Sequence, residues 1–134
     1  MSKSVEGSYI GLTDSLEEIR EKLAGAPTDS GHGEKLPEEG GVANLLTLVD
    51  LFMGDEKRER YKDLYLGSGL KYQELKEELA QAIYEELKPI QERRKHFEEH
   101  PREVEEILEA GRKYCAEIAK NTLAEVKKAM GLVL

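Results

Sequence analysis

The residues with the clearest potential for chemistry are two histidines four positions apart. The string His96-Phe-Glu-Glu-His100 matches the His-x-x-Glu-His pattern of some zinc proteases, and histidines at this spacing share one helix face and can chelate a metal ion. A helix here is expected to end at Pro101, and no separate segment offers an obvious third ligand in apolar surroundings. A solvated helix end explains the string better, so the sequence assigns no metal ligand.

Cys115 is the only cysteine in the chain. No internal disulfide can therefore form, which fits a reducing compartment. The residue falls on an apolar stripe of the last expected helix, and the sequence places no histidine beside it. We expect a packed thiol and not a nucleophile.

Two basic clusters stand out against a formal net charge of −8. One contains Lys57 and Arg58 with Arg60 and Lys62, and the other is the run Arg93-Arg94-Lys95. The overall negative charge argues against a protein held to nucleic acid by bulk electrostatics, so any RNA contact must come from a local patch. The alternative is that each cluster balances neighbouring glutamates on a solvated helix face.

These residues have to be positioned by helices, because apolar residues recur at helical spacing between the charges and no alternating strand pattern occurs. We predict an all-α fold: a helical bundle of about five helices, two of them long and antiparallel, after an irregular amino-terminal lead-in. The expected helices are one capped by Ser15 and Glu18 and closed by Gly25, and others over 44–54, 55–66, 72–99 and 101–131.

Three details of these helices are specific enough to be checked. Pro89 interrupts the first long helix and predicts a bend without a stop. The helix near Asn44 is apolar around much of its circumference, which predicts that it is the most buried element. In the last helix an apolar stripe is expected to face inward, formed by Val104, Ile107, Leu108, Gly111, Cys115, Ile118, Thr122, Val126 and Met130.

The chain contains no apolar run of about 20 residues that could cross a bilayer. Its amino-terminal stretch also has no apolar core of the signal-peptide kind. From the sequence we expect a soluble, cytoplasmic protein without a membrane partner.

Several strings, in order along the chain, resemble bacterial-type tryptophanyl-tRNA synthetases, which are class I aminoacyl-tRNA synthetases. The opening Met1-Ser2-Lys3-Ser4 is similar to the end of the family's Lys-Met-Ser-Lys-Ser loop. The family's next two features, a capped helix and a Thr-Asp-Ser segment, resemble Leu12-Thr-Asp-Ser-Leu-Glu-Glu-Ile19 and Ala26-Pro-Thr-Asp-Ser30. The family's Asn-Leu-Leu helix resembles Asn44-Leu-Leu-Thr-Leu48, and its long helix resembles Tyr72-Gln-Glu-Leu-Lys76 with Leu87-Lys-Pro-Ile90. The family's final helix resembles Ile107-Leu-Glu-Ala-Gly111. The resemblance covers nearly the whole chain.

The resemblance implies a catalytic and ATP-binding role for the first four residues. In the family, ATP with magnesium activates tryptophan to an adenylate, and a lysine ammonium stabilises the charge on the phosphates. Lys3 matches that catalytic lysine, with Met1, Ser2 and Ser4 as the rest of the ATP-binding loop. The nucleotide-binding fold that precedes this loop in the family is absent, so we expect the fragment alone to be inactive and to bind no cofactor.

The resemblance also implies a domain organisation and a partner. It indicates a loop remnant over 1–14, a short helix and linker over 15–41, and a helical anticodon-binding domain over 42–134. The partner would be tRNA(Trp), contacted by Arg93, Arg94 and Lys95 with Lys57 and Arg58, and a missing catalytic half or a second copy could complete the protein. DNA is not expected as a partner.

The sequence departs from the family pattern in three places, and these departures leave alternatives open. The first lysine of the loop and the preceding domain are missing, and the segment 28–42 is unusually rich in Gly and Glu. One alternative is a truncated relative that acts as a helical protein-interaction module without ligase activity. Another is the tyrosine-specific synthetase, although the Thr-Asp-Ser and Asn-Leu-Leu strings favour tryptophan.

Overall fold

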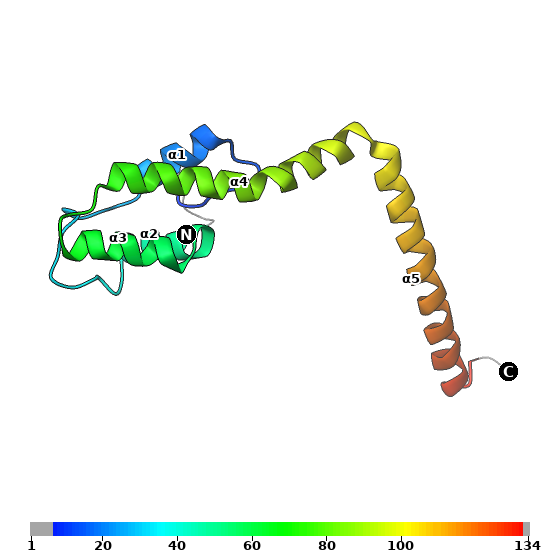
Figure 1. The fold of residues 1–134 in the computed structure, drawn as a ribbon. Coiled ribbons are helices and arrows are strands. Elements are labelled where there is room, and N and C mark those ends of the chain that lie inside the picture. Colours follow the sequence, from blue (N-terminus) through cyan, green and yellow to red (C-terminus); the bar gives the residue numbers. More distant parts are fainter. Residues whose placement is uncertain (1–6, 133–134) are drawn as a thin grey trace. The chain divides into compact units, whose positions relative to one another are not determined.

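The computed structural model describes residues 7–132. Within them the chain forms five α-helices and no strand, which confirms the predicted fold class (Figure 1). The helices are α1 (Leu16–Ala24), α2 (Gly41–Met53), α3 (Asp55–Leu66), α4 (Tyr72–Glu99) and α5 (Pro101–Ala129). None of the helices in this range is long and apolar enough to cross a membrane.

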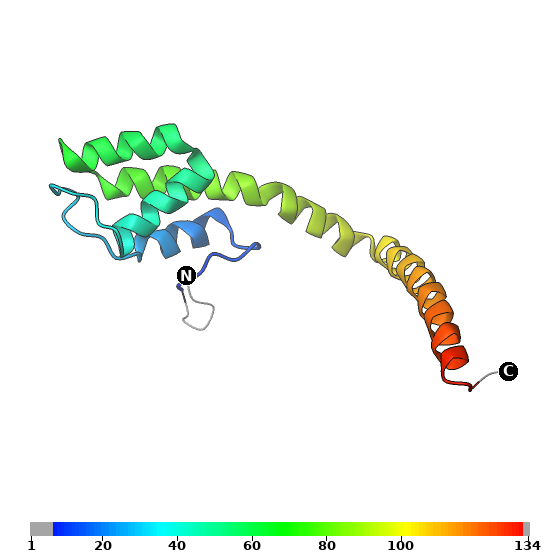
Figure 2. The ribbon, with the colours of Figure 1, turned by 90° about the horizontal axis from the view of Figure 1, so that it is seen from below.

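The chain divides into two compact units, Met1–Glu92 and Arg93–Leu134. The division falls inside α4, within the segment 42–134 that was predicted to be one helical domain. In the first unit α1, α2 and α3 lie along the first part of α4 (Figures 1 and 2). The second unit contains the last turns of α4 and the whole of α5.

α4 organises the core of the first unit. Its residues Leu75, Leu79, Ile83 and Leu87 are buried, and their spacing of four places them on one face of the helix. The buried face ends at Leu87, because Ile90 is exposed. Buried residues from the other helices complete the cluster, namely Ile19, Leu23, Val42, Leu45, Leu46, Val49, Tyr61 and Tyr65.

The predicted start of α1 is confirmed in detail. The hydroxyl of Ser15 accepts a hydrogen bond from the amide of Glu18, and the Glu18 carboxylate accepts one from the amide of Ser15 at 2.7 Å. This reciprocal capping satisfies two amide groups that have no partner within the helix. The predicted ranges of α3 and of α4 are also confirmed, and Pro89 lies within α4 without ending it.

The predicted start of α2 was wrong by three residues. The helix begins at Gly41, and no side chain caps it. A Cβ atom on Gly41 would lie 1.7 Å from the carbonyl oxygen of Pro27, so only glycine allows the loop to approach the helix this closely. The prediction relied on Asn44 as a side-chain cap, whereas Asn44 lies in the first turn, with its amide bonded to the Gly40 carbonyl.

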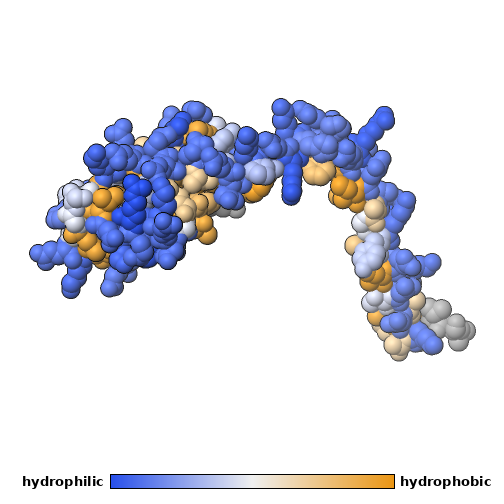
Figure 3. Space-filling model, in the orientation of Figure 1, coloured by the Kyte–Doolittle hydropathy of each residue, from blue (hydrophilic) through white to orange (hydrophobic). Residues whose placement is uncertain are grey.

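The prediction that α5 buries an apolar stripe was also wrong. None of its described residues is buried, and Ile107, Leu108 and Ile118 are all exposed. Figure 3 shows the apolar side chains as separate patches on the surface of this helix, between charged residues. The antiparallel pairing of the two long helices depended on that stripe, and it stays a prediction.

Candidate functional site

The basic cluster on α3 is largely neutralised by glutamates of the first unit. Lys57 Nζ lies 2.7 Å from an oxygen of Glu78 on α4, and Arg58 lies 3.0 Å from Glu59. Lys62 donates to the same Glu59 carboxylate at 2.6 Å, and these contacts lower the pKa of Glu59, with the Lys62 hydrogen bond as the largest cause. Lys57 and Arg58 therefore lie on a helix face where neighbouring glutamates balance their charge, which is the alternative interpretation that the sequence left open.

Tyr61 lies under this cluster and has a buried hydroxyl. No hydrogen-bond partner for that hydroxyl occurs within the described part of the chain. Burial raises the pKa of Tyr61 to about 12, and the Glu78 carboxylate contributes to the increase. The Tyr61 hydroxyl and the Glu78 carboxylate do not meet the distance and angle of a hydrogen bond, so the hydroxyl is unpaired in this part of the chain.

The second basic cluster, on α4 in the second unit, is more exposed. Arg94 Nε lies 2.7 Å from Glu98, and Lys95 Nζ lies 3.8 Å from Glu99, both one helical turn away. Exposed pairs of this kind contribute at most about 1 kcal/mol. Within residues 7–132 the ion pairs of this cluster involve Arg94 and Lys95, and none involves Arg93. These three cations are therefore more available to an anionic partner than Lys57 and Arg58.

The predicted ATP-binding residues Met1, Ser2, Lys3 and Ser4 lie outside the described residues. The segment that follows them, Gly7–Ile10, lines a pocket of about 1150 Å³ together with residues of α1 and α2. Lys22 of α1 reaches into this region, where its Nζ lies 5.2 Å from the centre of the Tyr9 ring. The part of the predicted loop remnant that follows the ATP-binding residues is thus folded against α1 and α2 of the first unit.

Asp29, part of the Thr-Asp-Ser string, anchors the loop between α1 and α2. Its two carboxylate oxygens accept hydrogen bonds from the hydroxyls of Tyr65 and Tyr72, each at 2.6 Å. The Gly31 amide donates to it at 2.8 Å, the local turn that Asp commonly forms with the residue two positions on. The Tyr65 hydrogen bond is the main cause that holds the pKa of Asp29 below its usual value, followed by the Tyr72 bond.

From the sequence, Asp29 was recognised only as part of a family-like string, and its role as a loop anchor was not predicted. Its one local signal was the Asp-Ser-Gly turn. The two tyrosines are 36 and 43 residues away along the chain, so no spacing rule connects them to Asp29. The structure assigns the string a structural function, which is to hold the loop against α3 and α4.

The prediction that Cys115 is a packed thiol was wrong, because it is exposed on α5. This error has the same cause as the wrong expectation that the apolar stripe of α5 is buried. Periodicity identified an apolar face and could not show whether anything covers it.

The chain is a member of the class I tRNA synthetases, because residues 1–88 match the family described as "tRNA synthetases class I (W and Y)". Similar proteins include a tryptophan–tRNA ligase of Wolinella succinogenes, 38% identical over 99% of this chain, and one of Halalkalibacterium halodurans, 36% identical over 98%. A tryptophan–tRNA ligase of Bacillus subtilis is 35% identical over 98% of the chain.

The chain spans about 40% of the length of these relatives. No solved structure matches it. The tryptophan-specific names agree with the resemblance seen in the Thr-Asp-Ser and Asn-Leu-Leu strings.

Proposed function

We propose that this chain is the carboxy-terminal, anticodon-binding portion of a tryptophan–tRNA ligase, working in the cytoplasm. The observation that carries the proposal is the similarity to proteins named tryptophan–tRNA ligase along 98–99% of the chain. The order of the family-like strings, which begin at Met1-Ser2-Lys3-Ser4, supports the carboxy-terminal placement. The parent enzyme would attach tryptophan to tRNA(Trp) with ATP and magnesium.

Arg93, Arg94 and Lys95 are the proposed main contacts to RNA. Unpaired anticodon bases are read by stacking and edge hydrogen bonds, while cations hold the phosphates. Arg93 is unencumbered by an ion pair in the described chain, and the exposed glutamates that pair with Arg94 and Lys95 can be displaced by phosphate at small cost. Lys57 and Arg58 are proposed as secondary contacts, because they must first give up closer carboxylate partners.

The test is the double substitution Arg93→Ala/Arg94→Ala, with binding of tRNA(Trp) measured by fluorescence anisotropy over a range of salt concentrations. Loss of two charged contacts is expected to weaken binding by about tenfold or more. Two lost phosphate contacts to an unpaired strand should also reduce the slope of log affinity against log salt by about 1.4.

A matched control removes the same charge elsewhere in the second unit. Lys120 and Lys127 are exposed on α5. The double variant Lys120→Ala/Lys127→Ala changes the net charge as much as Arg93→Ala/Arg94→Ala does, and it should weaken tRNA binding less. Equal effects of both double variants would show that only total charge matters. Unchanged binding by the Arg93→Ala/Arg94→Ala variant, with helix content intact, would remove these residues from the interface.

Lys3 is proposed as the lysine that acts on the phosphates of ATP in the parent, with Met1, Ser2 and Ser4 around it. Such a group is effective only when the surrounding fold holds it in place. We therefore expect the 134-residue chain alone to show no tryptophan-dependent exchange between ATP and pyrophosphate, and no ATP binding. Exchange catalysed by the purified chain would contradict this assignment.

The exposed apolar residues of α5 favour one other function, a helical protein-interaction module (Figure 3). A tRNA transcript with a tryptophan anticodon and a second with a swapped anticodon distinguish the two proposals. Preference for the first transcript supports the synthetase portion. A folded chain that binds neither transcript supports the interaction module.

A further inference from the structure

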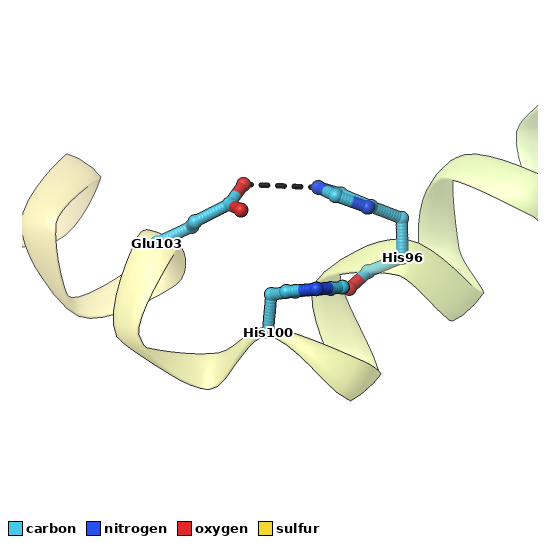
Figure 4. A group of neighbouring side chains, drawn as sticks. All are labelled: His96, His100 and Glu103. Atoms are coloured by element: carbon cyan, nitrogen blue, oxygen red, sulfur yellow. Dashed lines mark hydrogen bonds and ion pairs between the residues drawn. The ribbon is translucent and has the colours of Figure 1, made fainter.

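Three ligand-type side chains meet where α4 ends and α5 begins, all within the second unit. His96 comes from the last turns of α4, His100 precedes α5, and Glu103 lies in the first turn of α5. Each offers one ligand atom, and these atoms all lie within 4.8 Å of one another. Figure 4 shows His96 and Glu103 facing each other, with the His100 ring stacked against the His96 ring. The sequence pattern drew attention to the two histidines but was explained as a solvated helix end, and Glu103 was not considered beside them.

Hydrogen bonding prepares His100 as a ligand. Its Nδ1 lies 2.8 Å from the carbonyl oxygen of His96. Because a carbonyl only accepts, Nδ1 must carry the proton, and Nε2 is left with its lone pair. Metal-binding histidines commonly donate their second ring N–H to a carbonyl in this way, which fixes the tautomer and orients the ring. The two imidazoles are also stacked, with ring centres 4.4 Å apart.

His96 and Glu103 already face each other across the helix junction. Nε2 of His96 lies 3.0 Å from Oε2 of Glu103 (Figure 4). A zinc ion bound at about 2.0–2.2 Å from each donor needs donor atoms separated by roughly 3–4 Å. This pair therefore has the required separation. The three donor atoms lie within 4.8 Å of one another, and the exposed His100 ring has to turn out of its stack with His96 so that its lone pair points at the same ion. The His96 and Glu103 side chains are 50% and 48% exposed, so water can complete the coordination.

We propose that His96, His100 and Glu103 bind one divalent transition-metal ion, with zinc as the best fit. Two imidazoles and one carboxylate suit zinc, cobalt and nickel, while magnesium and calcium prefer oxygen donors alone. The bound ion would join the last turn of α4 to the first turn of α5. This is a binding site that fixes a helix junction, independent of the proposed tRNA function.

The other thiol and imidazole groups of the chain, on Cys115 and His32, lie outside this site. Cys115 is exposed and is the one thiol, but it lies about 18 Å farther along the axis of α5 than Glu103. His32, the remaining histidine, is exposed in the loop of the first unit. The substitutions Cys115→Ser and His32→Ala therefore serve as a clean background and a matched control.

The experiment is a titration of the full chain carrying Cys115→Ser with cobalt(II), followed by its visible absorption, and with zinc(II), followed by calorimetry. We expect saturation at one ion per chain, and displacement of cobalt by zinc. His96→Ala, His100→Ala and Glu103→Gln should each weaken binding by at least about tenfold. His32→Ala should leave the affinity unchanged.

Two results would overturn the proposal. One is the absence of saturable one-to-one binding, and the other is binding that the three substitutions leave intact or that His32→Ala reduces equally. Because all three residues are exposed, the variants are expected to fold, and far-ultraviolet circular dichroism at matched concentration checks this. Glu103→Gln keeps the size of the side chain and removes its charge, so its effect tests ligation directly.

Discussion

Leu79 of α4 provides the sharpest test of where the core lies. Its side chain is 0% exposed, and a Leu→Ala substitution at such a site costs about 3–4 kcal/mol, from lost burial and the cavity left behind. For a unit of this size the free energy of unfolding falls by about 1–1.5 kcal/mol per M of urea. Leu79→Ala should therefore lower the urea midpoint by roughly 2–4 M, which would bring the first unit close to unfolding in water.

Leu108 of α5 is the matched position, because it has the same side chain and is 67% exposed. Leu108→Ala removes little buried surface, and alanine is at least as good a helix former. The expected cost is below about 0.5 kcal/mol. Tyrosine fluorescence is a suitable signal for both variants, because the chain has no tryptophan and Tyr61 and Tyr65 are buried in the core.

The two variants should be compared at several protein concentrations, so that association of α5 with another chain would appear as a concentration-dependent midpoint. If Leu108→Ala lowered the midpoint as far as Leu79→Ala at every concentration, the apolar face of α5 would be packed within the chain in solution. The assignment of all buried residues to the first unit would then be refuted.

The remaining predictions concern single contacts, each followed by urea unfolding. Tyr65→Phe should lower the urea midpoint, because it removes a hydrogen-bond donor to Asp29. Tyr61→Phe should be neutral or stabilise the protein by up to about 1 kcal/mol, because it removes an unpaired hydroxyl. If Tyr61→Phe destabilised the protein more than Tyr65→Phe, the hydrogen bonds described would be contradicted. Because the folded-state pKa of Asp29 is lowered, its stabilising contribution is complete above about pH 4 and is lost as the pH falls through the folded-state value. Between pH 6 and 2 the difference between wild type and Asp29→Asn should therefore shrink, and a constant difference would exclude this linkage. Gly41→Ala should lower the free energy of unfolding by about 3 kcal/mol or more, because the new Cβ would meet a carbonyl oxygen. Gly111→Ala should raise it by about 0.5–1 kcal/mol, because nothing lies within 4 Å of the new Cβ. Equal effects of the two substitutions would contradict the close approach at Gly41.

The sequence predicted those features that short segments determine. The ends of α3 and α4 follow from local charge, glycine and apolar spacing, and the Ser15–Glu18 cap follows from two residues three positions apart. The start of α2 could not be predicted, because it depends on how closely a loop carbonyl approaches Gly41. The exposure of α5 was missed for a related reason: an amphipathic pattern shows which face is apolar, but whether that face is covered depends on other segments.

The same limit applies to the candidate sites. Residue type identified Lys57, Arg58 and Arg93 as cations, but their different availability depends on which carboxylates lie nearby in the fold. The arrangement of Glu103 beside two histidines depends on how the chain turns between Glu99 and Pro101. Sequence spacing describes positions along one helix, and it does not extend across such a turn.

The lack of buried residues in α5 has a consequence for hydrogen exchange. Its amides are protected only by the hydrogen bonds of the helix itself, so they can exchange by fraying from the ends and by opening a few turns at a time. The amides of α4 around Leu79 are released only when the first unit opens as a whole. A deuterium-uptake map should therefore show a steep decrease in protection beyond the middle of α4, along a chain that is helical on both sides of that decrease.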